Sequence, residues 1–172
     1  MTYTPTRRQT HCAFCGTRFA DRDDWPRDCP GCGETTWRNP TPVGVALLPV
    51  RDTDGTVALV VARRTIQPAL GALSLPGGYL ELGETWQQGV VRELHEETGI
   101  VADADQVELF DVDNGSATIQ VFGLLPLRDL AELPPSVATA ETEGWLLLDR
   151  PRRLAFPTQT AAVAKYFAMR SG

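Results

Sequence analysis

The chain has 172 residues, of which 42% are hydrophobic, and a net charge of −6. That is enough apolar sequence for one medium-sized core and a small appendage, and the negative charge disfavours broad electrostatic attachment to nucleic acid. No segment is long enough to span a membrane, and no apolar stretch follows Arg7 and Arg8. We therefore expect neither a signal peptide nor a membrane anchor, and a cytoplasmic location.

All four cysteines lie near the N-terminus, in two pairs with the same spacing. Cys12-x-x-Cys15 and Cys29-x-x-Cys32 are each followed by glycine and are separated by thirteen residues. This pattern predicts a zinc ribbon, in which four thiolates hold one structural Zn²⁺ that takes no part in catalysis. Disulfides and a redox pair are the alternatives. Two matching Cys-x-x-Cys-Gly motifs, or knuckles, fit a metal site better, because the chain shows no secretory signal. His11 adjoins the first pair and could replace a thiolate, although we favour a surface position for it.

The stretch Asn39-Pro40-Thr41-Pro42 marks the change from turn-rich to strongly apolar sequence. We place the domain boundary there, with the zinc ribbon at residues 1–38 and a second domain at residues 39–172. In chain order, the second domain is predicted to contain strands over 43–50, 57–64 and 72–75, a helix over 85–98, strands over 107–112, 118–125 and 144–148, and a helix over 158–169. The first two strands would form a hairpin around Asp54-Gly55. Hairpins together with crossovers indicate an α/β domain with a mixed sheet.

The predicted helix over 85–98 carries a cluster of acidic residues. It contains no proline, and Gly99 supplies a natural end for it. At about 100° per residue, Glu93, Glu96 and Glu97 fall on one arc, while aliphatic residues occupy the neighbouring arc. One side of the helix is therefore predicted to pack, and the adjacent side to present three carboxylates.

Three neighbouring carboxylates repel one another, and a hard divalent cation such as Mg²⁺ or Mn²⁺ relieves this repulsion most simply. Because Mg²⁺ commonly shares its ligand shell with substrate phosphates, the cluster indicates hydrolysis of a phosphate ester or phosphoanhydride. A solvated acidic helix face is the alternative that the residues alone leave open.

A longer pattern surrounds these carboxylates. Residues 78–100 match G-x5-E-x7-R-E-U-x-E-E-x-G-U at every position, where U is a bulky aliphatic residue, through Gly78, Glu84, Arg92, Glu93, Leu94, Glu96, Glu97, Gly99 and Ile100. This is the signature of the Nudix hydrolases, which the segment resembles. The resemblance implies an α/β/α sandwich and metal-dependent hydrolysis of a nucleotide substrate.

The resemblance also implies roles for individual residues. It makes Glu93, Glu96 and Glu97 the metal ligands, with the carbonyl of Gly78 as an additional ligand. Arg92 and Glu84 would form an ion pair that fixes the loop before the helix, although Glu84 could also reach a metal.

The general base varies in position among members of this family. Glu143 and Glu141 in Glu-Thr-Glu-Gly-Trp are our candidates, with ordinary acidic loop residues as the alternative interpretation.

A zinc ribbon before a Nudix domain resembles the NADH pyrophosphatases, and also a group of short Nudix proteins, including plant chloroplast enzymes, that act on FAD and ADP-ribose. The NADH pyrophosphatases carry S-Q-P-W-P-F-P shortly after the box, whereas residues 110–123 here read FDVDNGSATIQVFG. The residue runs 64–68 and 155–158 also look more like the short group. We therefore expect cleavage of ADP-ribose or FAD to a nucleoside monophosphate, with NADH or NAD as the alternative.

Two other functions remain as hypotheses: a regulator that binds a nucleotide without hydrolysing it, and an enzyme that removes oxidised nucleoside triphosphates. The intact carboxylate set argues against the first. A homodimer is expected only by analogy with related enzymes. Candidate substrate contacts are aromatic residues that could stack and arginines that could bind phosphate, with ordinary packing and surface positions as the alternatives: Trp25, Trp37, Tyr79, Phe156, Arg63 and Arg64.

Overall fold

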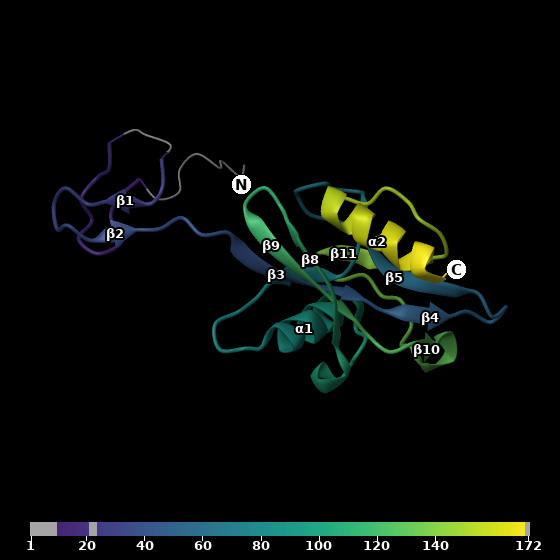
Figure 1. The fold of residues 1–172 in the computed structure, drawn as a ribbon. Helices are drawn as coiled ribbons and strands as arrows, with labels where there is room; N and C mark the ends of the chain where they lie inside the picture. Colours follow the sequence, from purple (N-terminus) through teal and green to yellow (C-terminus); the bar gives the residue numbers. More distant parts are fainter. Residues whose placement is uncertain (1–9, 21–23, 171–172) are drawn as a thin grey trace. The chain divides into compact units, whose positions relative to one another are not determined.

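The structure is a computed structural model that describes residues 10–20 and 24–170 (Figure 1). Contacts within the chain divide it into two compact units, one ending at Pro40 and the other beginning at Thr41. In the described part of the chain, no helix combines the length and the apolar character needed to cross a membrane.

The first unit is small and contains little regular structure. Its strands β1 (Arg27–Asp28) and β2 (Thr35–Thr36) pair antiparallel. Its core consists of Cys12, Cys29 and Phe19, against which Trp25 packs. The rings of Phe19 and Trp25 meet edge to face, with their centroids 6.1 Å apart. So few buried groups supply little hydrophobic stabilisation, and two of these three buried residues are cysteines.

The described second unit contains two mixed sheets. One sheet has the order β7-β3-β9-β8, with β7 at Gly77–Tyr79, β3 at Thr41–Leu47, β9 at Thr118–Leu124 and β8 at Glu108–Asn114. The other has the order β10-β4-β5-β11, with β10 at Arg128–Asp129, β4 at Pro49–Arg51, β5 at Val57–Arg64 and β11 at Thr142–Leu148, while β6 (Leu73–Ser74) also pairs with β5. The pairs β3–β9 and β4–β10 are parallel, and the remaining pairs are antiparallel.

Two helices cover opposite sides of these sheets (Figure 1): α1 (Trp86–Thr98) and α2 (Pro157–Arg170). Side chains of β3 alternate between them, because successive strand residues point to opposite faces. Val45 and Leu47 join the core that includes α2, and Ala46 joins the core that includes α1. The short 3₁₀ helices η2 (Ala104–Gln106) and η3 (Leu130–Glu132) complete the described elements. The α/β/α arrangement confirms the expected fold class.

The prediction of one continuous strand over 43–50 is wrong. The chain over 43–50 breaks at Leu48, so that β3 belongs to one sheet and β4 to the other. Pro49 begins β4 and has no N–H to donate, which prevents the preceding ladder from continuing unchanged. The carbonyl of Leu48 instead accepts a hydrogen bond of 3.0 Å from the N–H of Val60. The expected hairpin therefore joins β4, and not β3, to β5.

Candidate active site

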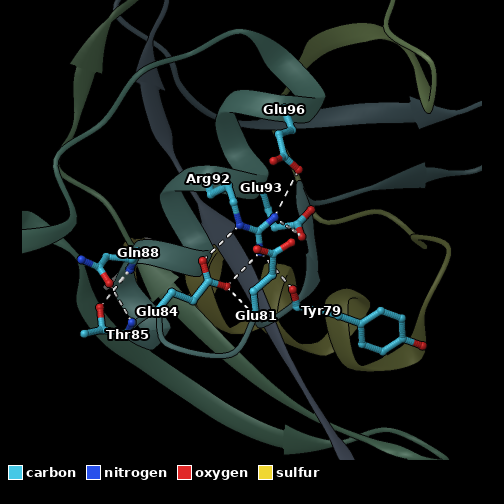
Figure 2. Close-up of polar contacts among 8 residues, drawn as sticks. All are labelled: Tyr79, Glu81, Glu84, Thr85, Gln88, Arg92, Glu93 and Glu96. Carbon is cyan, nitrogen blue, oxygen red and sulfur yellow. Dashed lines mark hydrogen bonds and ion pairs between the residues drawn. The ribbon is translucent and has the colours of Figure 1, made fainter.

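The ends of α1 are fixed by local signals. The Thr85 side chain accepts a hydrogen bond of 3.2 Å from the Gln88 N–H, and the Gln88 side chain accepts one of 2.8 Å from the Thr85 N–H (Figure 2). This reciprocal capping box satisfies backbone donors that a helix start otherwise leaves free. At the other end, Gly99 adopts φ +74° and its N–H bonds the His95 carbonyl at 2.7 Å. Both ends lie where the sequence predicted them.

A single guanidinium connects the loop before α1 to the carboxylates on α1. Arg92 donates two hydrogen bonds to the carboxylate of Glu84, at 3.1 and 2.9 Å, and one of 3.0 Å to the carbonyl of Tyr79 (Figure 2). It also donates to Glu93 at 2.8 Å and to Glu96 at 3.2 Å. The fork of Arg92 thereby holds three carboxylates and the loop backbone in one arrangement.

Glu84 also bonds the backbone of the loop that precedes α1. Its Oε1 accepts a hydrogen bond of 2.6 Å from the Glu81 N–H. The hydrogen bonds from Arg92 and from this N–H hold the pKa of Glu84 below its ordinary value, since they favour the charged carboxylate. Glu84 is thus ionised, and both of its carboxylate oxygens accept hydrogen bonds from Arg92.

The loop backbone lies directly against Glu93. A Cβ placed on Gly78 would lie 2.4–2.5 Å from the carboxyl group of Glu93, a distance that no side-chain carbon tolerates. Glycine at this position therefore permits the close approach of backbone to carboxylate. Burial raises the pKa of Glu93, although the hydrogen bond from Arg92 opposes this shift.

Glu97 is the most buried carboxylate of the cluster, with only 4% of the residue exposed. Its Oε2 is buried and has no hydrogen-bond partner in the described structure. Burial raises the pKa of Glu97 to about 8, and the charge of Glu93 adds to this shift while Arg64 opposes it. A buried carboxylate oxygen without a partner is costly, and a hard cation beside it would satisfy it. The residues present therefore fit a divalent cation, with Glu96 as the exposed member of the set.

This environment predicts a pH dependence of stability for protein freed of Mg²⁺ and Mn²⁺ but retaining metal at its cysteines. Between the ordinary glutamate value of 4.5 and the folded value of about 8, folded Glu97 holds a proton that the unfolded chain has released. The free energy of unfolding should therefore fall as the pH rises through this window, by at most about 1.4 kcal/mol per pH unit. Denaturant unfolding at pH 5.5, 7 and 8.5 measures this slope. Mg²⁺ should reduce the slope, whereas a slope of the opposite sign would contradict the burial argument.

The two candidate bases lie in different surroundings. The Glu143 carboxylate is exposed and lies 3.5 Å from Nε of Arg63. Glu141 contributes to the raised pKa values of both Glu93 and Glu97. Between the two candidates, Thr142 is buried and donates a hydrogen bond of 2.9 Å to the backbone carbonyl of Glu97. The charge of Glu141 thus acts on the carboxylate cluster, whereas Glu143 pairs with Arg63.

The two candidate arginines also differ in whether they act on the carboxylate cluster. Arg64 donates to the Pro68 carbonyl at 2.9 Å, and its guanidinium lies 5.4 Å from the ring centroid of Phe156. Its charge also acts on Glu97. Arg63 instead donates to the Gly71 carbonyl at 2.8 Å, in addition to its contact with Glu143.

The other candidate aromatic residues are dispersed. Trp25 packs in the core of the first unit, under the guanidinium of Arg27 at 4.3 Å, and Trp37 is exposed. Tyr79 ends strand β7, and its exposed ring points away from the Arg92 network in Figure 2. Tyr79 adjoins the carboxylate site through its backbone carbonyl, which accepts from Arg92, and Phe156 contacts Arg64.

In the first unit, the four cysteine sulfurs form one cluster. All four Sγ atoms lie within 4.8 Å of one another, with Cys12 and Cys32 at 3.7 Å and Cys15 and Cys29 at 3.5 Å. All four thiols are free, and these separations are far beyond a disulfide bond. Sulfurs around a tetrahedral Zn²⁺ lie about 3.8 Å apart, given a Zn–S distance of about 2.3 Å. The cluster therefore fits a tetrahedral thiophilic metal.

The two knuckles have the same backbone geometry. The N–H two residues after each leading cysteine donates to its sulfur, from Phe14 to Cys12 at 3.4 Å and from Gly31 to Cys29 at 3.3 Å. Each following glycine has a positive φ, and its N–H bonds the carbonyl of the leading cysteine. The hydrogen bond with Thr17 lowers the pKa of Cys15 to about 6. His11 is exposed, and its Nδ1 shares a hydrogen bond with Thr10.

A model of the NUDIX domain family matches residues 40–166, and the chain therefore belongs to the Nudix family. The chain is 40% identical over 57 residues to an ADP-ribose pyrophosphatase of Methanocaldococcus jannaschii. This alignment covers 33% of this chain and 32% of the relative. The chain is 33% identical over 95 residues to the NAD-capped RNA hydrolase NudC of Pseudomonas aeruginosa. This alignment covers 55% of this chain and 32% of the relative. The chain thus aligns with about a third of the length of these relatives. The family and the fold together define a Nudix domain.

Solved structures agree on the fold. A NUDIX hydrolase from Nitrosomonas europaea superimposes with a TM-score of 0.72 at 24% identity, over 95% of this chain and 93% of that one. The NUDIX domain of Shewanella oneidensis NrtR, solved as a complex with ADP ribose, gives a TM-score of 0.64 at 20% identity, over 79% of this chain and 91% of that one.

Proposed function

We propose that this Nudix hydrolase cleaves the phosphoanhydride of a nucleoside diphosphate linked to a second group, with ADP-ribose or FAD as substrate. The observation that carries the proposal is the buried, unpartnered oxygen of Glu97 within a cluster of three carboxylates. The ADP-ribose pyrophosphatase similarity and the ADP ribose complex of the NrtR domain support the substrate class.

The residues that would hold Mg²⁺ or Mn²⁺ are Glu93, Glu96 and Glu97, with the carbonyl of Gly78. Such a cation, when bound, offsets the charge of the substrate phosphates and lowers the pKa of a coordinated water. We also propose one structural Zn²⁺ at Cys12, Cys15, Cys29 and Cys32, for which the sulfur cluster and the matched knuckles are the support.

The chain's own residues supply positioning and proton transfer. Arg92 holds Glu93 and Glu96 in place and keeps Glu84 ionised, so that these carboxylates are ordered before substrate binds. An exposed carboxylate near this cluster can accept the proton that the attacking water loses, and Glu141 has this position. Water attacks phosphorus directly, the phosphoanhydride oxygen leaves with its electron pair, and no covalent enzyme intermediate forms.

The assignment of the base predicts different effects for two neighbouring carboxylates. Glu141→Gln is expected to lower kcat about 10²-fold, because a positioned base typically contributes 10²- to 10⁴-fold. Glu143→Gln is the matched control, since its carboxylate pairs with Arg63, and its kcat should stay within about twofold of wild type. Steady-state rates across pH 6–9 measure both. Equal losses in the two variants, or a larger loss in Glu143→Gln, would reverse the assignment.

Product analysis tests the substrate class. Zinc-replete protein with Mg²⁺ is incubated with ADP-ribose, FAD, NADH, NAD⁺ and nucleoside triphosphates, and the products are separated by chromatography. The expected result is AMP from ADP-ribose or FAD, together with a phosphorylated second product. Preferential cleavage of NADH would favour the alternative that the NudC similarity supports. Nucleotide binding without turnover would instead support a regulator.

A further inference from the structure

Strand β6 leads, through Leu75 and Pro76, into strand β7 of the proposed active site. One edge of β6 pairs with β5, with Ser74 opposite Ala62 and Leu73 opposite Arg63. The other edge meets the chain segment that enters α2, where the N–H of Ala155 donates to the Leu73 carbonyl at 2.7 Å. This edge of β6 therefore bonds the segment before α2 and no further strand of the described sheet.

Gln159, in the first turns of α2, continues this contact with its side chain. Its Oε1 accepts a hydrogen bond of 3.0 Å from the N–H of Leu75, and its Nε2 lies 3.4 Å from the carbonyl of Leu75 as a donor. The amide thus offers Leu75 the acceptor and donor that a neighbouring strand would offer. Gln159 and Leu75 are both buried, at 3% and 1% exposure, so water cannot replace these hydrogen bonds.

Only two residues separate Leu75 from Gly78 of strand β7, which lies against the carboxylates. Pro76 follows Leu75, and its carbonyl accepts a hydrogen bond of 2.8 Å from Ala46 of β3. Gly78 comes next but one, pairs with Gly44 of β3 and lies in close contact with Glu93. Because proline restricts its own backbone, a displacement of Leu75 is transmitted to the start of β7 rather than absorbed at Pro76.

The helix that carries Gln159 is itself anchored. The Thr158 hydroxyl donates a hydrogen bond of 2.6 Å to the side chain of Gln120, a buried residue of β9. Val163, one turn beyond Gln159, is fully buried in the core shared by α2 and the sheets. Gln159 therefore connects a rigid helix to a backbone that has little freedom of its own.

We propose that Gln159 is a positioning residue that sets the place of Gly77 and Gly78 at the start of β7 relative to Glu93 and Glu97, and thereby the affinity of this site for a divalent cation. The inference rests on the cation site of the proposed function. The residue lies far from the signature in sequence and belongs to no part of it.

The test is the Mn²⁺ affinity of zinc-replete protein, measured without substrate from the electron paramagnetic resonance signal of free Mn²⁺. Gln159→Leu keeps a side chain of similar length and removes both hydrogen bonds to Leu75. Its Kd for Mn²⁺ is expected to rise about tenfold, as it does when groups that orient metal ligands are lost. Saturating metal should restore most of kcat, with little change in KM for the nucleotide.

Val163→Ala is the matched control, because it lowers stability from the same face of α2 and removes no hydrogen bond to Leu75. Its melting temperature should fall, while its Kd for Mn²⁺ should stay within about twofold of wild type. An equal rise of Kd in both variants, or an unchanged Kd in Gln159→Leu, would overturn the inference. Absence of Mn²⁺ binding by the wild type would overturn the cation site and the inference together.

If Gln159→Leu does not fold, Gln159→Glu takes its place in the same measurement. It keeps an acceptor for the N–H of Leu75 and loses the donor to the carbonyl, so a smaller rise of Kd is expected. An unchanged Kd in this variant would also overturn the inference.

Discussion

Glu97→Gln should lower kcat on the order of 10²- to 10³-fold, which corresponds to about 3–4 kcal/mol of transition-state stabilisation. The amide keeps the shape of the side chain but removes the charge that a divalent cation requires. Folding should survive the change, because the metal-free protein already favours an uncharged Glu97, with burial raising its pKa to about 8. The measurements are steady-state turnover with Mg²⁺, and the melting temperature without it.

The same variant separates a catalytic loss from a folding loss. At pH 8.5 without Mg²⁺ or Mn²⁺, its melting temperature should equal or exceed that of wild type, and the pH dependence of its stability should be shallower. Glu108→Gln makes the same chemical change at an exposed position of β8 and should alter neither property. Turnover of Glu97→Gln close to that of wild type would remove Glu97 from the site.

Loss of the proposed zinc is expected to unfold the first unit while the second unit stays folded. Two of the buried groups in the small core of the first unit are the proposed ligands Cys12 and Cys29, and units of this size seldom fold without a metal or disulfides. Cys29→Ser should therefore abolish the binding of one zinc per chain. Metal analysis measures the stoichiometry, and amide spectra should show collapsed signals for Gly16 and Gly33 but dispersed signals for residues of β3 and β5.

His11→Ala is the control for the zinc experiment. His11 lies next to Cys12 in sequence, but it bonds Thr10 and is not part of the sulfur cluster. This variant should retain one zinc and a folded first unit. Loss of zinc in His11→Ala, or retention of zinc in Cys29→Ser, would show that the ligand set differs from the four cysteines.

The features that the sequence predicted well depend on signals close together in the chain. Helix α1 begins after Thr85 and ends before Gly99 because the capping box and the left-handed glycine act within one turn of each end. Helical geometry then brings the glutamates to one arc without help from the rest of the fold. The spacing of the cysteines fixed their clustering for the same reason.

The features that the sequence did not predict depend on partners far away. Pro49 marks the break of the first strand at Leu48, but it does not specify that the residues before it pair with β9 and those after it with β5. The hydrogen bond from Thr142 to the end of α1 and the contact of Gln159 with Leu75 likewise join distant segments. A threonine or a glutamine in such a position looks like any other polar residue until the sheets assemble.

The parallel pairing of β3 with β9 has a consequence for the order of folding. Thr41 lies opposite Thr118 and Leu47 opposite Leu124, so β3 gains this neighbour only after the whole signature has been synthesised. Contacts between such distant segments form slowly, because a long loop must close before any contact stabilises it. A nascent chain that stops short of β9 would hold every residue of the signature and still lack the sheet that presents them. On the ribosome, the protein should therefore gain the proposed metal affinity late, when β9 and then α2 have emerged.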